Sequence, residues 1–309
     1  MKVVITGGTG FVGSHLVSQL HREGHDLVIL SRNVVRARRV FPAADFPRVT
    51  LMEYAPSVSG DWQQVVSGCE GVVNLAGAPI AERWTPAHQK AVLDSRKVGT
   101  EKIVEAIAQA VDKPRVLVSA SAIGFYGSSE TATFDETSQP ANDNFLSQVC
   151  QAWEAAAQEV TTVGGVRLVI PRIGIVLGKG GALERMLTPF QLFAGGPIGS
   201  GQQWFSWIHI DDLVALLIKA LSDPTMQGIY NATAPNPVRM TAACEALGAA
   251  LNRPSWLPVP SFVIETLLGD GAMVVLEGQQ VLPKHLQAQG FAYQYSNIAQ
   301  AMKAVVSEL

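Results

Sequence analysis

Three glycines near the start of the chain have the spacing of a turn that could bind phosphate. Gly8, Gly10 and Gly13 follow a β-branched run, Val3 to Ile5, that is typical of a buried parallel strand, and apolar residues then recur at helical spacing. Without a Cβ at these positions, backbone N–H groups can approach a pyrophosphate, and the dipole of the following helix favours the anion. Because the glycines lie between a strand and a helix, we expect a dinucleotide site rather than an ordinary glycine-rich turn.

The residues after the second predicted strand indicate which dinucleotide would bind. This strand, Asp26 to Leu30, ends in Ser31 and Arg32, about 20 residues beyond the glycines, where an NAD site usually has an acid for the ribose 2′-hydroxyl. No acid is present there, and a hydroxyl beside a cation suits the 2′-phosphate of NADP. We therefore expect NADP in preference to NAD, while a solvated loop arginine remains the alternative for Arg32.

Small and polar residues also follow later strands, which we expect to begin at Gly71, Val116 and Val166. The carboxyl ends of parallel strands are where such folds bind their ligands. The residues expected to bind the cofactor are Thr6, Gly7, Gly8, Thr9, Gly10, Phe11, Val12, Gly13, Ser31, Arg32, Asn74, Leu75, Ala76, Gly77, Ser119 and Pro171.

An Arg-Trp pair leaves the fourth predicted strand, close to where a nicotinamide would lie. Arg83 could hold a carboxylate or phosphate of a substrate, and Trp84 could stack on a flat ligand. A packing role for a half-buried Trp84 is an equal alternative. We therefore treat the pair as candidate substrate-binding residues.

The composition limits the classes of protein to which this chain could belong. The 309 residues are 48% hydrophobic and 16% charged, which is typical of a globular protein large enough for one domain and a smaller lobe. The net charge is −3 and no basic tract is present, so we expect a small-molecule substrate and no nucleic-acid partner. No apolar run reaches the roughly 18 residues of a membrane span, and no signal peptide is expected.

The cysteines and histidines do not suggest a metal site. Cys69, Cys150 and Cys244 are scattered, as expected for reduced thiols in the cytoplasm or another reducing compartment. His209 precedes Asp211 and Asp212, and we expect an aspartate to cap the following helix rather than to bind a metal.

The alternation of strands and helices predicts an α/β fold, with a Rossmann-like, doubly wound parallel sheet and a smaller C-terminal substrate lobe. We expect the NADP-binding domain to span 1–175, with segments around 205–235 returning to it. Residues 176–309 would form most of the substrate lobe, including a C-terminal segment, 253–301. The later helices are expected at Gly180 to Phe193, Leu213 to Leu221, Met240 to Leu251, Phe262 to Leu268 and Val274 to Val281.

Over essentially its whole length the chain resembles the extended short-chain dehydrogenases/reductases. The motifs that carry the resemblance are Thr6-Gly7-Gly8-Thr9-Gly10-Phe11-Val12-Gly13, Asn74-Leu75-Ala76-Gly77, Ser121 to Gly127, Pro171-Arg172 and Trp207 to Leu213. More narrowly, Arg83-Trp84, Ser95-Arg96, Gly124 to Gly127, Trp153 to Ala157 and the segment from Arg253 to Phe291 resemble the NAD-dependent epimerase/dehydratase family proteins of the SDR39U1 type. The resemblance implies a Rossmann fold that binds NADP, and it implies no particular substrate. We expect a monomer or homodimer.

One departure from the superfamily concerns proton transfer. Its usual Tyr-x-x-x-Lys pair aligns with Leu146 and Cys150, which supply neither a phenol nor a cation. Ser121 matches the position of the superfamily's catalytic serine. Tyr126 lies outside the usual pair, and without a lysine it would donate a hydrogen bond to a carbonyl rather than act as a base. A role in packing or in a loop hydrogen bond is an equal alternative for Tyr126. We take Ser121 and Tyr126 as candidate catalytic residues and expect Cys150 to be structural.

Two hypotheses on function follow. The first is an NADP(H)-dependent epimerase or oxidoreductase that transfers hydride to or from a small carbonyl, hydroxyl or sugar-nucleotide compound. The second is a non-catalytic NADP-binding redox sensor or scaffold. The absent Tyr-Lys pair favours the second hypothesis, and the retained Ser121, Tyr126 and Arg83 favour the first.

Overall fold

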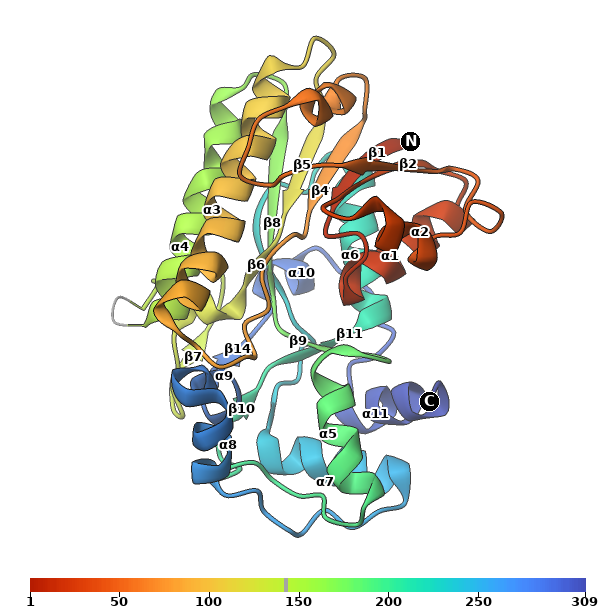
Figure 1. The fold of residues 1–309 in the computed structure, drawn as a ribbon. Helices are drawn as coiled ribbons and strands as arrows, with labels where there is room; N and C mark the ends of the chain where they lie inside the picture. The colour runs from red at the N-terminus through yellow and green to blue at the C-terminus, as the bar shows by residue number, and fades with distance from the viewer. Residues whose placement is uncertain (142–143) are drawn as a thin grey trace.

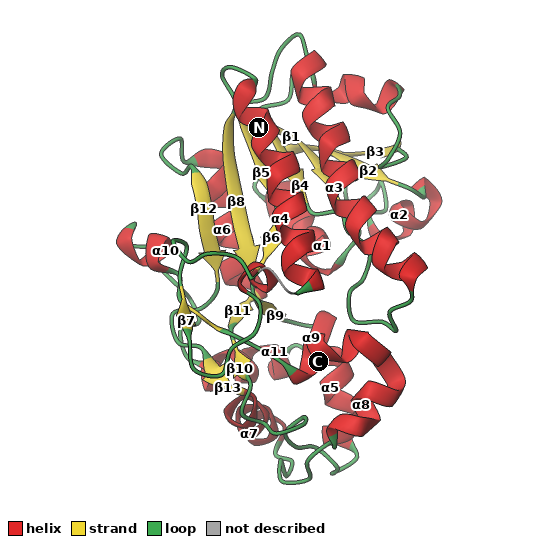
Figure 2. Cartoon of the chain, turned by 90° about the vertical axis from the view of Figure 1, so that its left-hand side faces the viewer, coloured by secondary structure: helices red, strands yellow, loops and turns green. Residues whose placement is uncertain are grey.

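A parallel β-sheet forms the centre of the N-terminal two thirds of the chain. The computed structural model describes all residues except 142–143, and its eight-stranded sheet has the order β12-β8-β5-β4-β1-β2-β3, with β6 pairing β8 (Figures 1 and 2). The strands are β1 (Lys2–Thr6), β2 (Asp26–Ser31), β3 (Val49–Glu53), β4 (Gly71–Asn74), β5 (Val116–Ser119), β6 (Ser121–Ala122), β8 (Arg167–Ile173) and β12 (Gly228–Ala232). Every pairing in this sheet is parallel, which confirms the predicted Rossmann-like α/β fold.

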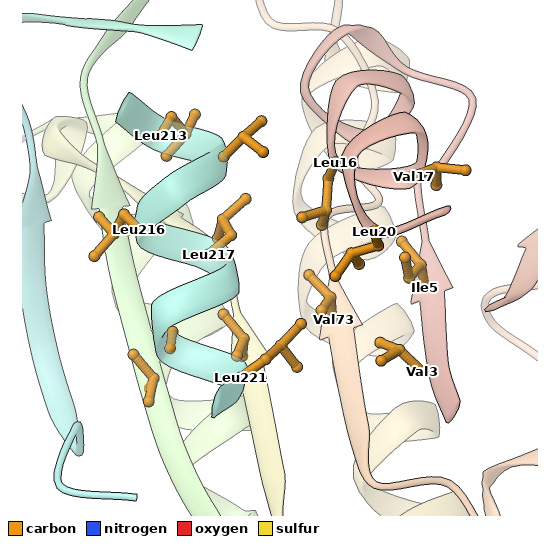
Figure 3. Packing of buried hydrophobic residues seen from close by; sticks show 14 of the residues in the cluster. Val3, Ile5, Leu16, Val17, Leu20, Val73, Leu213, Leu216, Leu217 and Leu221 are labelled. Atoms are coloured by element: carbon orange, nitrogen blue, oxygen red, sulfur yellow. The ribbon is translucent and has the colours of Figure 1, made fainter. Parts of the chain in front are cut away.

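Helices cover both faces of the sheet because alternate residues of each buried strand face opposite sides. Val3 and Ile5 pack with leucines of α1 (Phe11–Arg22) and α6 (Ile210–Ser222), as Figure 3 shows. Val4, between them, belongs to a separate cluster with Ile103 and Ile107 of α3 (Pro86–Gln109). The helix α4 (Phe145–Gln158) lies beside α3 on that second face (Figure 1).

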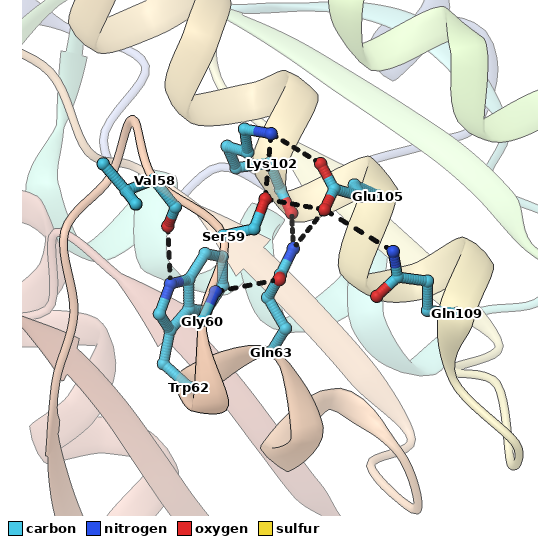
Figure 4. Close-up of polar contacts among 8 residues, drawn as sticks. All are labelled: Val58, Ser59, Gly60, Trp62, Gln63, Lys102, Glu105 and Gln109. Atoms are coloured by element: carbon cyan, nitrogen blue, oxygen red, sulfur yellow. Dashed lines mark hydrogen bonds and ion pairs between the residues drawn. The ribbon is translucent and has the colours of Figure 1, made fainter.

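A polar cluster holds the segment after β3 against α3. In Figure 4 the carboxylate of Glu105 accepts hydrogen bonds from Lys102 (2.7 Å), Ser59 (2.7 Å) and Gln63 (3.2 Å). These bonds lower the pKa of Glu105 to about 2, with those from Lys102 and Ser59 contributing most. The cluster therefore fixes the connection between β3 and the short 3₁₀ helix Asp61–Val66.

The C-terminal part of the chain has its own apolar core. The helices α5 (Gly181–Gln191), α7 (Met240–Leu251) and α11 (Ile298–Ser307) pack around Trp207 in the lower half of Figure 1. Three small two-stranded sheets lie in this half: β9 (Ile175–Leu177) with β11 (Trp207–His209), β10 (Trp204–Phe205) with β13 (Val238–Arg239), and β7 (Thr133–Phe134) with β14 (Gln280–Val281). The remaining helices are α2 (Val34–Val40), α8 (Ser261–Leu268), α9 (Met273–Leu276) and α10 (Lys284–Ala288).

Two local predictions were wrong. The helix expected over Val274 to Val281 ends with α9 at Leu276, because Gly278 lies against the backbone of Trp204 and the chain then pairs with β7. A Cβ on Gly278 would lie 2.0 Å from the Trp204 carbonyl oxygen, so this close packing replaces helix formation.

The second error concerns the start of α6. His209, and neither aspartate, caps this helix, because its Nδ1 accepts a hydrogen bond from the Asp211 N–H at 3.2 Å. Asp212 instead accepts backbone hydrogen bonds from Gln294 and Tyr295 and so ties the C-terminal segment to α6.

The described part of the chain contains no helix long and apolar enough to cross a membrane. Nor do its histidines, cysteines and acids form a group of three that could hold a metal.

Candidate functional site

The glycine-rich turn packs tightly and leaves the first turn of α1 open to a ligand. Gly7 has a φ of +68°, and a Cβ on it would lie 2.8 Å from the Leu75 carbonyl carbon. A Cβ on Gly13 would lie 2.2 Å from the Gly7 carbonyl oxygen, so α1 needs this glycine to approach the turn. The helix begins after Gly10 without a side-chain cap, whereas α3 and α4 are capped by Thr85 and Asn144. These features fit a pyrophosphate at the α1 N-terminus.

The polar side chains at the ends of β1, β4 and β5 bond to one another. Thr6 Oγ1 donates to Asn74 Oδ1 at 2.7 Å, and Asn74 Nδ2 donates to Thr100 (2.8 Å) and Ser119 (3.3 Å). All four side chains are buried. The network therefore fixes the strand ends on which a dinucleotide would lie.

The other predicted cofactor residues surround this network. Thr9 is exposed in the turn, Val12 is half-buried on α1, and Pro171 is buried within β8. The Phe11 ring packs against Gly180 and Gly181. The N–H groups of Leu75 and Ala76 both donate to Thr6 Oγ1 at 3.2 Å, Gly8 is buried against Ile29, and Gly77 faces Arg96.

Arg32 is a free cation at the end of β2. Its side chain is exposed and makes no hydrogen bond or ion pair to any described residue, while Ser31 Oγ donates to the Asn33 carbonyl at 3.1 Å. The charge of Arg32 acts on the nearby Tyr54. Burial raises the pKa of the Tyr54 phenol to about 12, and the positive charge of Arg32 opposes that rise. An unpaired guanidinium here fits the 2′-phosphate of NADP.

The two candidate catalytic hydroxyls belong to one buried network. Ser121 Oγ donates to Glu154 Oε1 at 2.6 Å, and Arg172 holds both oxygens of Glu154 at 2.8 Å. The Arg172 guanidinium also donates to the Tyr126 hydroxyl at 2.9 Å, and Tyr126 in turn donates to Asn231 at 2.7 Å. The ion pair of Glu154 and Arg172 thus links Ser121 at one end to Tyr126 at the other.

This network determines how the two hydroxyls can act. Burial raises the pKa of Tyr126, and the adjacent Arg172 only partly offsets that rise, so the phenol is protonated at neutral pH. The protons of Ser121 and Tyr126 are both donated to neighbouring oxygens. Neither group is poised as a general base.

Leu146 and Cys150 lie one turn apart on α4 and both face Gly124. A Cβ on Gly124 would lie 3.4 Å from Leu146 Cβ and 3.8 Å from Cys150 Sγ, so both side chains line the same wall. Burial and the nearby Glu154 raise the pKa of the Cys150 thiol to about 11, against the opposing charge of Arg96. The thiol is therefore protonated at neutral pH.

A cavity of about 170 Å³ lies between this wall and the C-terminal part of the chain. Its N-terminal side is formed by the segment after β6, by α4 and by Arg96 of α3, and its opposite side by Trp204, Ser206 and the α9 region. The lining residues are Ile80, Arg96, Ala122, Ile123, Gly124, Gly127, Ser128, Asn144, Leu146, Val149, Cys150, Trp153, Ile173, Gly174, Ile175, Trp204, Ser206, Met273, Val274, Glu277, Gly278 and Gln279.

Arg83 and Trp84 do not line this cavity. Arg83 Nη1 donates to the Thr266 carbonyl of α8 at 2.8 Å, and the Trp84 indole donates to the Ile80 carbonyl at 2.8 Å. Trp84 is buried with its ring edge-on to Phe145. The pair joins the loop after β4 to α4 and α8, and Ile80 of that loop reaches the cavity wall.

Sequence reasoning gave no chemical role to four side chains that the structure places at the site. Glu154 and Arg172 form the buried ion pair, and Arg96 and Trp153 line the cavity. Each belongs to a motif seen in the sequence, but the apolar helix pattern around Trp153 and Glu154 does not reveal a buried carboxylate. The signal that could have identified this buried carboxylate is a glutamate on the inward face of an alanine-rich helix, because a buried acid needs a cation as its partner.

Comparisons with known proteins agree with this geometry. The sequence profile of the NAD dependent epimerase/dehydratase family matches residues 3–232, and that of a domain of unknown function, DUF1731, matches residues 259–305. The Epimerase family protein SDR39U1 homolog, chloroplastic, of Arabidopsis thaliana is 48% identical, over 99% of this chain and 87% of the relative. Epimerase family protein SDR39U1 of Bos taurus is 39% identical, over 99% of this chain and 100% of the relative.

A solved structure extends the likeness to three dimensions. The crystal structure of the human epimerase family protein SDR39U1 (isoform 2) with NADPH superposes with a TM-score of 0.87, at 35% identity and with 100% of each chain covered. The profile match, the full-length relatives and the parallel sheet agree: the chain belongs to the NAD-dependent epimerase/dehydratase family and ends in a DUF1731 domain.

Proposed function

We propose that the chain is an NADP(H)-dependent oxidoreductase that acts on a small carbonyl or hydroxyl compound in the cavity beside Cys150. The observation that carries the cofactor assignment is the unpaired Arg32 at the end of β2, together with the uncapped N-terminus of α1. The crystallised human relative, which contains NADPH, supports it. NAD is the less favoured cofactor because no carboxylate follows β2.

The residues of this chain would bind and orient the reactants. The glycine-rich turn would hold the pyrophosphate, Arg32 and Ser31 the 2′-phosphate, and the ends of β4 and β5 the rest of the dinucleotide. Bound NADPH supplies a hydride. Because Leu146 and Cys150 provide no base and no cation, we infer that the site works mainly by placing the carbonyl close to the hydride donor.

We infer that Ser121 and Tyr126 act as oriented hydroxyl groups rather than bases. Neither lines the cavity and each donates its proton inside the buried network, so one of these bonds would have to break before the hydroxyl donates to a substrate oxygen. Charge that develops on a carbonyl oxygen during reduction is stabilised by fixed donors and dipoles. Arg83 and Trp84 would contribute to substrate binding through the loop that carries Ile80. The cavity of about 170 Å³ is smaller than the usual range of ligand sites, about 300–1,000 Å³, which favours a small compound over a whole sugar nucleotide.

The reaction is tested by following the near-ultraviolet absorbance of NADPH while small aldehydes, ketones and oxo acids are added to the purified chain. Oxidation of NADPH by at least one class of carbonyl is expected. Ser121→Ala should then mainly lower turnover and Arg83→Ala should mainly weaken substrate binding, with NADPH affinity unchanged in both. If neither substitution alters the activity, the reaction site has been placed wrongly.

A non-catalytic NADP-binding sensor or scaffold is the second candidate. The absence of a lysine at position 150 and the buried, protonated thiol there favour it. Tight NADPH binding without oxidation by any carbonyl would support this candidate against the first.

We also infer a reducing compartment, such as the cytoplasm, because Cys69, Cys150 and Cys244 are unpaired and buried. The Arabidopsis relative is described as chloroplastic, so the compartment can differ between relatives. A monomer or homodimer is our proposal for the assembly, which light scattering would test.

A further inference from the structure

Arg96 places a guanidinium on the wall of the cavity. Its Nη1 donates to the carbonyls of Ala78 (3.0 Å) and Val92 (3.2 Å), which fixes the side chain beside the end of β4. A Cβ on Gly77 would lie only 2.9 Å from Arg96 Cζ, so the absence of a side chain at position 77 makes room for this arginine. These contacts therefore hold the Arg96 guanidinium at this place on the wall.

No acid in the described part of the chain balances this charge. Among residues 1–141 and 144–309, Arg96 forms no ion pair, and its Nε and Nη2 groups have no acceptor. Burial lowers the pKa of Arg96, and the neighbouring thiol of Cys150 is the group that opposes this shift. Arg172 shows the contrast, because its guanidinium, which is almost completely buried, is neutralised by Glu154. A half-buried cation without a counter-charge indicates a site for an anion.

A second, independent donor lies beside it. The Trp153 side chain is 5% exposed and lines the cavity, yet its indole N–H finds no acceptor in the described chain. Arg96 Cζ lies 5.1 Å from the centre of the Trp153 ring, so the two groups belong to one patch of wall. Buried N–H donors are nearly always bonded, and an orphan donor in a cavity therefore points to a ligand oxygen.

We propose that Arg96 and the indole N–H of Trp153 form a subsite for a carboxylate or phosphate group of the substrate. This inference rests on the proposed oxidoreductase function, because it names the chemical class of the compound that enters the cavity. The substrate is then a small carbonyl or hydroxyl compound that also carries an anionic group. Arg96 would neutralise that group and orient the reacting carbon through a charge-assisted hydrogen bond.

The phosphates of the dinucleotide are not the anion that this subsite would serve. Their expected ligands are the glycine turn between β1 and α1 and the free Arg32 after β2, neither of which lines the cavity. Arg96 instead lines the N-terminal side of the cavity, opposite Trp204 and the residues around α9.

Isothermal titration of the NADPH-saturated chain with malonate and, separately, with inorganic phosphate tests the subsite. These probes distinguish a carboxylate-binding from a phosphate-binding site. Saturable binding of at least one probe is expected, and Arg96→Gln should weaken it about ten- to hundredfold, as loss of a charge-assisted bond implies. Trp153→Phe should weaken it about two- to tenfold, and Arg96→Lys should retain part of the affinity.

Arg253→Gln is the matched control. Arg253 also stacks on an aromatic ring, with Cζ 4.4 Å from the centre of Phe193, but it lies outside the cavity lining. This variant should bind the probes as the unaltered chain does, and all variants should keep their NADPH affinity. The subsite is overturned if neither probe binds the unaltered chain, or if Arg96→Gln binds both probes unchanged.

A loss of NADPH affinity in folded Arg96→Gln or Arg96→Lys would also overturn the proposal, because it would assign the cation to the cofactor. Failure of the proposed reaction is distinguishable from failure of the subsite. If the anion binds through Arg96 while no carbonyl compound oxidises NADPH, the subsite stands and the reaction does not.

Discussion

Arg172 donates two hydrogen bonds of 2.8 Å to Glu154, and both side chains are almost completely buried within the N-terminal domain. The guanidinium also stacks on the Phe125 ring, with Cζ 3.4 Å from the ring centre. Glu154 comes from α4 and Arg172 from β8, so the pair joins a helix to the sheet. Their sequence neighbours Trp153 and Ile173 line the cavity. Ser121 and Tyr126 are oriented by the two ends of this pair.

Glu154→Gln should strongly destabilise the protein. The substitution leaves the Arg172 cation buried without a counter-charge, and breaking such a pair typically costs about 3–5 kcal/mol. Urea denaturation followed by circular dichroism measures the change in the free energy of unfolding. Glu159→Gln, an exposed glutamate at the end of the same helix, is the control and should change stability by less than about 0.5 kcal/mol. Equal stability of the two variants would show that the ion pair does not hold α4 to β8.

Arg32→Ala should lower the affinity for NADPH and leave that for NADH almost unchanged. The alanine removes a charge-assisted bond to the 2′-phosphate, worth about 1.5–3 kcal/mol. Fluorescence titration with each dinucleotide gives both dissociation constants. Arg39→Ala removes an exposed cation in the last turn of α2 and serves as the control. An equal loss of affinity for NADPH and NADH, or no loss of affinity for either, would mean that Arg32 does not bind the 2′-phosphate.

The Cys150 thiol should react slowly with alkylating reagents at neutral pH. Its pKa is raised to about 11, chiefly by burial, so little thiolate exists at pH 7 and the rate should rise as the pH approaches 11. Mass spectrometry of the alkylated peptides follows the reaction, with urea-unfolded protein as the fast reference. Cys150→Ala should keep NADPH binding. Rapid alkylation of the native thiol that NADPH blocks would instead identify a reactive cysteine at the site.

The cluster around Glu105 should contribute to stability in a defined pH window. Its pKa falls from 4.5 to about 2 on folding, so the native state favours the carboxylate. The contribution is fully present above about pH 4.5 and is lost as the pH falls from 4.5 towards 2. Because the group is partly exposed, we expect it to be less than about 1 kcal/mol.

Thermal unfolding of Glu105→Gln at pH 7 and at pH 3 measures this difference. The variant should be less stable than the unaltered chain at pH 7, and the gap should narrow at pH 3. Glu101→Gln, which breaks an exposed pair with Lys97 on the same helix, provides the comparison and should have little effect at either pH. A gap for Glu105→Gln that does not depend on pH would contradict the assigned shift.

The sequence predicted the sheet and the turn between β1 and α1, and led us to expect NADP, because these signals are local. The run Val3 to Ile5, the glycines at 8, 10 and 13, and the absent acid after Leu30 each need only neighbouring residues to be interpreted. The site in the cavity depends on contacts across the chain. Nothing near Ser121 in sequence shows that Glu154 would accept its proton. Nothing near Arg96 shows that no acid of the described chain would pair with it.

The same distinction explains the errors. Val274 to Val281 has an apolar pattern compatible with a helix, but Gly278 packs on the distant Trp204 and the chain pairs with β7. Arg83 stays a candidate substrate-binding residue, and its bond to the carbonyl of Thr266, a residue far along the chain, could not be predicted from its neighbours. The domain limits and the roles of the site residues stay predictions.

Transfer of deuterium from NADPH labelled at the reactive ring carbon shows whether the chain passes a hydride to a carbonyl compound. The purified chain is incubated with each of the two stereochemically labelled cofactors and with small carbonyl compounds, with and without a carboxylate, and the products are analysed by mass spectrometry. We expect one of the two labels to appear on the former carbonyl carbon of the compounds that carry an anionic group. A chain that binds NADPH tightly yet passes deuterium to none of them would contradict the oxidoreductase and favour the non-catalytic sensor.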